Sequence, residues 1–84
     1  DAARGYRDVN LTAMKLVERG GYLITCSCSH YMTMPLFEKT LADAALASGR
    51  RVKCLEVRVQ APDHPSLLTA EETNYLKAFY LQIF

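Results

Sequence analysis

The carboxyl-terminal segment YLKAFYLQIF, residues 75–84, constrains the fold of this chain more than any other feature. It is apolar on both of its alternating faces, apart from Lys77 and Gln82. Successive side chains of a strand point to opposite faces, so a strand of this kind needs cover on both sides. The segment therefore predicts a central strand in a sheet whose other strands come earlier in the chain.

An amphipathic helix is expected near the start of the chain. Its apolar face has a spacing of three or four residues and consists of Val9, Ala13, Leu16 and Val17. Asp8 or Asn10 can serve as its N-cap, since a short polar side chain accepts hydrogen bonds from the free amides of the first turn. The pair Gly20 and Gly21 is expected to end it.

A strand and a second helix should follow. Tyr22–Thr25 is apolar or β-branched on both sides, which predicts a strand covered on both faces. Thr33 can cap the next helix, and Pro35 is tolerated in its first turn. Gly49 should stop this helix after Ser48. Its predicted buried stripe consists of Phe37, Leu41, Ala44 and Ala45.

Residues 52–60 alternate in polarity, which predicts a half-exposed strand at a sheet edge. Leu55, Val57 and Val59 are expected to face one way and Glu56, Arg58 and Gln60 the other. Cys54 lies inside this strand and is expected to be buried and inert. The next fifteen residues, 61–75, contain two prolines and read as a long loop, which is usually functional or disordered.

The predicted order is helix, strand, helix, strand and strand, which defines an α/β fold. The first two strands should run parallel, with a right-handed crossover through the second helix. The doubly apolar last strand most simply inserts between them and runs antiparallel to the edge strand, which gives a mixed sheet. The first helix has no preceding strand, so the chain resembles the second half of a doubly wound domain.

Size and charge exclude several classes of protein. The chain has 84 residues, 50% of them apolar, and a net charge of +1, which by itself favours neither nucleic acid nor membrane as a partner. No apolar run approaches the ~20 residues of a membrane span. Three cysteines, an odd number, indicate free thiols in a reducing cytoplasm. A basic cluster, either a solvated strand edge or a phosphate-contacting patch, consists of Arg50, Arg51, Lys53 and Arg58.

The segment CSCSH, residues 26–30, lies at the carboxyl end of the first strand, where open α/β sheets bind ligands. Four interpretations stay open from the residues alone. In the first, Cys26, Cys28 and His30 bind zinc with Cys54 or His64 as a fourth ligand; in the second, the two cysteines form a redox pair. In the third, the cysteines pack as small apolar residues. Alternatively, Cys26 is a nucleophilic thiolate.

Two long motifs resemble a known family. GYxDxNLxAxKLVxxGGYLxTCSCSH, residues 5–30, and RVxxLExRxQAPDHPxLLxxxETxYLK, residues 51–77, resemble the last third of the bacterial large-subunit ribosomal RNA cytosine-5 methyltransferases. The resemblance implies a Rossmann-like class I methyltransferase that uses S-adenosylmethionine. Residues 1–84 would then form the carboxyl-terminal part of its catalytic domain.

The resemblance also implies roles for individual residues. A Thr-Cys-Ser motif supplies the nucleophile of RNA cytosine-5 methyltransferases, and Cys26 is the matching position. Ser27, Cys28 and His30 would lie around the substrate. Asp63, His64 and Pro65 would line the pocket, although the two prolines at 62 and 65 can also merely stiffen a turn. Asp8 and Asn10 match the family as well.

No cofactor-binding residue is predicted, because none of the four glycines forms the expected phosphate- or cofactor-binding turn after a strand. The chain alone is therefore expected to be inactive, with ribosomal RNA as the partner of the parent protein. Two alternatives remain. One is a methyltransferase of another substrate without covalent catalysis, and the other is a packing or dimerisation module that self-associates through an open sheet edge at residues 22–29.

Overall fold

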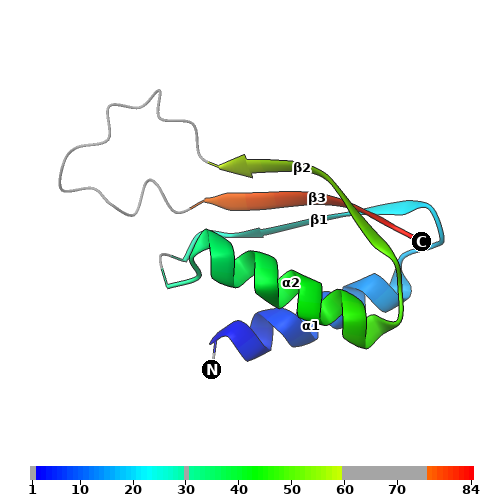
Figure 1. The fold of residues 1–84 in the computed structure, drawn as a ribbon, viewed down its shortest axis with the longest axis horizontal. Coiled ribbons are helices and arrows are strands. Elements are labelled where there is room, and N and C mark those ends of the chain that lie inside the picture. Colours follow the sequence, from blue (N-terminus) through cyan, green and yellow to red (C-terminus); the bar gives the residue numbers. More distant parts are fainter. Residues whose placement is uncertain (1, 30, 60–75) are drawn as a thin grey trace.

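The computed structural model describes residues 2–29, 31–59 and 76–84. Its elements follow the predicted order and are α1 (Ala2–Leu16), β1 (Gly21–Ser27), α2 (Met34–Ser48), β2 (Val52–Val59) and β3 (Lys77–Ile83). The sheet order is β1-β3-β2, with β3 antiparallel to both neighbours. The expected insertion of the last strand between the first two is therefore confirmed (Figure 1). Every strand pair of the described residues is antiparallel, and the expected mixed sheet is not seen in this part of the chain.

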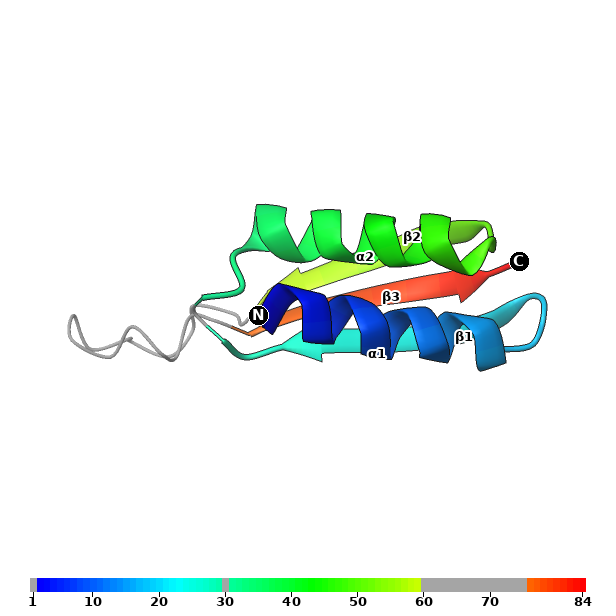
Figure 2. The same cartoon turned by 90° about the horizontal axis from the view of Figure 1, so that it is seen from below.

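Both helices lie side by side on one face of the sheet (Figure 2). The core forms between these two layers. Phe37 of α2 makes edge-to-face ring contacts with Tyr6 of α1 at 5.9 Å and with Phe79 of β3 at 5.3 Å. The buried apolar residues are Met14, Met32, Phe37, Leu41, Ala44, Phe79, Leu81 and Ile83.

The second helix forms as its sequence predicts. The Thr33 hydroxyl accepts a hydrogen bond of 3.3 Å from the amide of Leu36, and Pro35 occupies the first turn. Gly49 ends the helix in the left-handed conformation, with φ at 72°, where a side chain would be strained. Phe37, Leu41 and Ala44 are buried, as expected.

The first helix differs from its prediction in both its start and its face. Asp8 and Asn10 lie in its interior, so neither is an N-cap. Asn10 is buried and its side-chain amide donates to the Tyr6 carbonyl at 2.8 Å, whereas Val9 and Leu16 of the predicted apolar face are 70% and 79% exposed. The helix has turned so that Asn10 and Met14 face the core.

Gly20 belongs to the connection after α1, which ends at Leu16, and Gly21 is the first residue of β1. Gly20 has a φ of 83°, the left-handed region that glycine tolerates. A Cβ atom on Gly21 would lie 2.8 Å from Cγ1 of Val17 and 2.9 Å from the carbonyl oxygen of Glu18. The two glycines therefore permit the tight turn into β1.

The sheet face opposite the helices is open in the described chain. Tyr22 and Ile24 of β1 are 68% and 61% exposed, so the prediction that this strand is covered on both faces is wrong for the chain as described. In β3, Phe79, Leu81 and Ile83 face the helices and are buried, while Tyr80 and Gln82 on the other face are half-buried. The central position of β3 is confirmed. In the described chain the helices cover only one face of the sheet (Figure 2).

The edge strand β2 carries an irregularity between Cys54 and Glu56. Val57 pairs with Phe79 and Val59 with Lys77, so both face the helix side, opposite Glu56 and Arg58 as predicted. Leu55 falls at the bulge, where the simple alternation fails. Cys54 is exposed, so the expectation of a buried thiol is wrong. Gln60 and the predicted loop 61–75 lie outside the described residues.

Candidate functional site

The carboxyl end of β1 presents two reactive side chains on opposite faces of the sheet. Cys26 is exposed and pairs with Ala78 of β3, on the same open face as Tyr22 and Ile24. Ser27 is only 2% exposed and points toward the helices. This division follows from the alternation of side chains along a strand. The Cys26 thiol is thus the group that a ligand on the open face can reach.

Ser27 is held from two sides. Its hydroxyl donates to the Tyr6 phenol oxygen at 3.0 Å and accepts from the Ser29 amide at 3.2 Å. The second bond closes a small turn directly after the strand, of the kind that serine side chains support. Because Tyr6 also packs against Phe37, this turn is tied to the helix layer and core.

Lys77 fixes the same turn from β3. It stands opposite Ser27 in the strand register, is 7% exposed, and donates from Nζ to the Ser29 carbonyl at 3.1 Å. A buried ammonium group requires such partners, because its desolvation is costly. The backbone after Cys26 is therefore set by contacts from α1 and β3.

The thiols do not assemble a metal site with the other described residues. No group of three or more His, Cys, Asp or Glu side chains that could hold a metal occurs in residues 2–29, 31–59 and 76–84. Cys54 pairs with Leu81, whereas Cys26 pairs with Ala78 three positions away, and the two cysteines lie on opposite faces at opposite edges. Cys54 is thus excluded as a partner of Cys26. In this structure all three cysteines are free thiols.

Several predicted site residues cannot be placed. His30, Asp63, His64 and Pro65 lie outside the described residues. Cys28 follows the strand and is exposed.

Asp8 and Asn10, which match the family motif, lie within α1. The Asp8 carboxylate pairs with Arg7 at 3.1 Å on the surface, while Asn10 is buried against the Tyr6 carbonyl. The Asn10 side chain therefore stabilises the helix that carries Tyr6.

Pattern reasoning missed Tyr6 and Lys77 as parts of the site. Both stand inside the family motifs, in GYxDxN and YLK, so the resemblance contained a signal. Their contact with the strand end depends on packing between segments that are 21 and 48 residues apart along the chain. Spacing within one segment carries no information on such a contact.

Comparison with known proteins assigns the fold of the chain to a class. A solved Streptococcus mutans protein, assigned as a SAM-dependent methyltransferase, superposes with a TM-score of 0.78 at 18% identity, over 98% of this chain and 21% of that chain. At this low identity, the likeness defines the fold. The chain thus has the fold of one part of a SAM-dependent methyltransferase.

Sequence similarity points to a more particular group. The chain is 48% identical over 82 residues to the Ribosomal RNA large subunit methyltransferase I of Escherichia coli O1:K1, and equally to that of Shigella boydii serotype 18. Each match covers 98% of this chain and 21% of the relative, so the chain spans about a fifth of the length of these relatives. No protein-family model matches it. Within residues 2–29, 31–59 and 76–84, neither helix has the length and apolar character needed to cross a membrane.

Proposed function

We propose that this chain is the carboxyl-terminal part of the catalytic domain of an S-adenosylmethionine-dependent methyltransferase that modifies large-subunit ribosomal RNA in the cytoplasm. The main support is the 48% identity to ribosomal RNA large subunit methyltransferase I across nearly the whole chain. The sheet order and the fold likeness to a methyltransferase agree with it.

Cys26 is proposed as the nucleophile, with C5 of a cytosine as the methylated atom. The observation that carries this proposal is an exposed thiol at the carboxyl end of β1, just before a turn that Ser27 and Lys77 hold. The base must leave any stack to reach such a thiol. Ser27 would act by holding the turn, and Cys28, His30, Asp63, His64 and Pro65 remain proposed substrate contacts.

Covalent catalysis explains why a thiol is useful here. Attack of the Cys26 thiolate on C6 of cytosine forms a sulfur–carbon bond and moves the electron pair of the C5–C6 double bond toward C5. After C5 has gained its methyl group, loss of the C5 proton restores the double bond and expels the thiolate. Such a covalent intermediate divides one difficult substitution into easier steps.

The cofactor would supply the methyl group, but the described residues do not build its site. A glycine-rich turn at the carboxyl end of a strand normally holds such a cofactor. Here Gly20 precedes β1 and Gly21 begins it, Gly5 lies within α1, and Gly49 ends α2. None stands at the strand end that carries Cys26. The 84-residue chain alone is therefore proposed to be inactive.

The test uses the intact protein that carries this chain and RNA containing 5-fluorocytosine, from which the C5 substituent cannot leave as a proton. The wild type should form a covalent protein–RNA adduct, and Cys26→Ala should abolish it. Cys54→Ala, on the opposite edge, is the matched control and should form the adduct normally. An adduct retained by Cys26→Ala would disprove the nucleophile assignment. Methylation of RNA by a wild type that forms no adduct would instead favour the alternative without covalent catalysis.

A further inference from the structure

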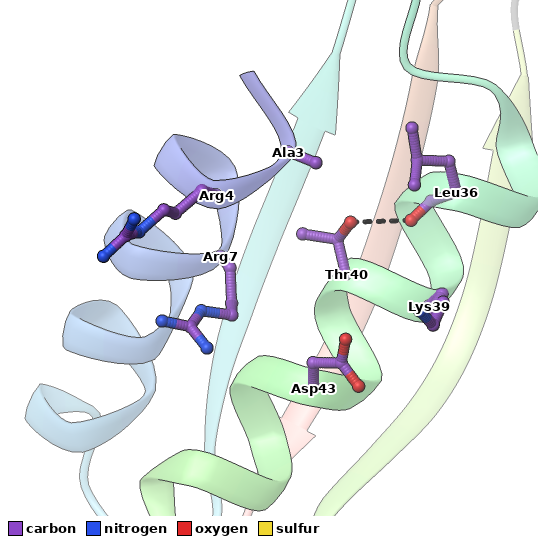
Figure 3. Close-up of a pocket in the computed structure, with 7 residues that line it drawn as sticks. All are labelled: Ala3, Arg4, Arg7, Leu36, Lys39, Thr40 and Asp43. Atoms are coloured by element: carbon purple, nitrogen blue, oxygen red, sulfur yellow. Dashed lines mark hydrogen bonds between the residues drawn. The ribbon is translucent and has the colours of Figure 1, made fainter. Parts of the chain in front are cut away.

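A basic groove lies between the amino-terminal halves of α1 and α2 (Figure 3). It has a volume of about 400 Å³ and is open to solvent. Its polar part is defined by Arg4 and Arg7 from α1 and by Lys39, Thr40 and Asp43 from α2, with Ala3 and Leu36 as apolar walls. The hydroxyl of Thr40 is bonded to the Leu36 carbonyl at 2.7 Å, which leaves the charged groups to define the binding chemistry.

The groove opens at the end of the molecule where the proposed nucleophile lies. The starts of α1 and α2 lie toward the end of the molecule at which β1 ends (Figures 1 and 2). The groove lies on the helix side of the sheet, whereas Cys26 is exposed on the opposite face. The partial positive charge at a helix amino terminus adds to the field of the basic side chains. Among the described residues, neither helix has an acidic side chain in its first turn to offset it.

The lining residues favour an anion. The lining contains three cationic side chains and one carboxylate, that of Asp43. Arg7 also meets the Asp8 carboxylate at 3.1 Å, but this is an exposed pair of adjacent residues, and such pairs contribute little. Guanidinium groups bind phosphate oxygens with two parallel hydrogen bonds, which suits Arg4 and Arg7 to a phosphodiester.

The basic cluster noted in the sequence is less suited to this role. Arg50 donates to the carbonyls of Met14 and Val17. Arg58 forms an exposed pair with Glu56 and lies over the Tyr80 ring; it shares the open-face row of Ala78 and Cys26, so it is separated from the rest of the cluster. Arg51 and Lys53 remain exposed, but they stand at the start of β2, the opposite end of the sheet from Cys26. The groove thus combines positive charge with a position toward the same end of the molecule as the carboxyl end of β1.

We propose that the basic groove binds the phosphate backbone of the RNA substrate on the helix side of the sheet, while the nucleotide to be modified is presented to Cys26 on the opposite face. This inference rests on the proposed function, because it assigns the groove to the same RNA. Binding through phosphates positions a nucleic acid without reading its sequence. The groove therefore contributes affinity and alignment, and the choice of nucleotide is made elsewhere.

The test measures RNA binding by the intact protein as a function of salt, with an unmodified ribosomal RNA fragment as the probe. Arg4→Gln, Arg7→Gln and Lys39→Gln are combined in one variant. Loss of three phosphate contacts should weaken binding about tenfold or more near 0.1 M salt and reduce the slope of log K against log salt by about 2. The KM for RNA should rise by more than kcat falls. Circular dichroism and thermal unfolding verify that the variant is folded.

Two further variants test whether the effect belongs to this groove. Asp43→Asn removes a carboxylate from the same lining and should tighten RNA binding. The double variant Arg51→Gln and Lys53→Gln removes two exposed cations from the opposite end and should leave both affinity and salt slope unchanged. If the groove acts through its charge, the triple variant weakens RNA binding and Asp43→Asn strengthens it. General disruption of the helices would weaken RNA binding in both of these variants.

The possible outcomes distinguish a wrong assignment of the groove from a wrong assignment of the reaction. If the wild type methylates RNA but the triple variant keeps its affinity and salt slope, the groove assignment is wrong and the proposed function stands. An equal loss in the Arg51 and Lys53 control also overturns the groove. If the triple variant loses RNA affinity while the wild type forms no adduct and no methylated RNA, the groove is upheld and the reaction is wrong.

Discussion

The Ser27 hydroxyl donates a hydrogen bond of 3.0 Å to the Tyr6 phenol oxygen, and this bond joins the end of β1 to the first helix. Ser27 is buried on the helix side, while its neighbour Cys26 is exposed on the other face. The bond therefore fixes the strand end from behind, without occupying the face where the thiol is accessible.

Replacing Tyr6 by Phe should lower the free energy of unfolding by about 1 kcal/mol, because the buried Ser27 hydroxyl loses its acceptor. The ring contact with Phe37 should survive, since the phenyl group is retained. Chemical denaturation gives the stability, and the rate of adduct formation reports on the strand end. Tyr22→Phe, at a 68% exposed position, is the matched control and should change stability by less than about 0.5 kcal/mol. Equal effects of the two substitutions would contradict a structural role for the bond.

Lys77→Met should slow adduct formation by about tenfold to a hundredfold while the KM for RNA changes little. Met preserves most of the apolar stem but cannot donate to the Ser29 carbonyl, so the turn after Cys26 loses one restraint. Small displacements of a reacting group are sufficient for losses of this size. Lys53→Met, on the exposed part of β2, provides the control. A rise in KM with an unchanged kcat would instead place Lys77 in RNA binding.

Arg50 closes the carboxyl end of α1 from a distant part of the chain. Its guanidinium donates to the carbonyls of Met14 and Val17 at 2.9 Å each, and to Phe84 at 2.8 Å. The Met14 and Val17 carbonyls are at the helix end, where carbonyls are left unpaired, and a cation there is also favoured by the helix dipole.

Arg50→Ala should consequently lower the free energy of unfolding by about 2 kcal/mol. Arg50→Lys should recover only part of this loss, since an ammonium group cannot span three carbonyls as the planar fork does. Denaturant titration of both variants beside Arg51→Ala measures the difference. The expectation fails if Arg50→Ala is no more destabilising than Arg51→Ala, whose side chain is exposed.

The parts of the fold that were predictable are those encoded locally. Thr33, Pro35 and Gly49 define α2 because capping and helix termination depend on neighbouring residues. The central position of β3 followed from its two apolar faces. In contrast, the face of α1 was misjudged because tertiary contacts bury the polar Asn10 and leave Val9 exposed.

In the candidate site, too, locally encoded features were predictable and those that depend on tertiary contacts were not. Cys26 was placed at a strand end by its own segment and by the family motif, and the structure places it there in an exposed position. The supports from Tyr6 and Lys77 arise only after folding, since their partners are far away along the chain. The irregularity between Cys54 and Glu56 likewise interrupts at Leu55 the alternation that the sequence pattern predicted.

Cys54→Ser should change the free energy of unfolding by less than about 0.5 kcal/mol, as surface substitutions usually do. The matched comparison is Leu81→Ala at the paired position of β3, which is 4% exposed and should cost about 2–5 kcal/mol. Thermal and denaturant unfolding of both variants measures the contrast. A large loss for Cys54→Ser would mean that this edge of β2 is covered in the intact protein.

The 84-residue chain on its own should self-associate through β1. Within the described residues, this strand pairs only with β3, and its open face exposes Tyr22 and Ile24. An unprotected strand edge beside an apolar surface recruits a second copy, and a charge placed on it prevents such pairing. Sedimentation of the chain should therefore show dimers or larger species, and Ile24→Lys should shift the population toward monomer. Val9→Lys, on the outer side of α1, is the control and should leave the association unchanged. A wild-type chain that remains monomeric at high concentration would contradict this prediction.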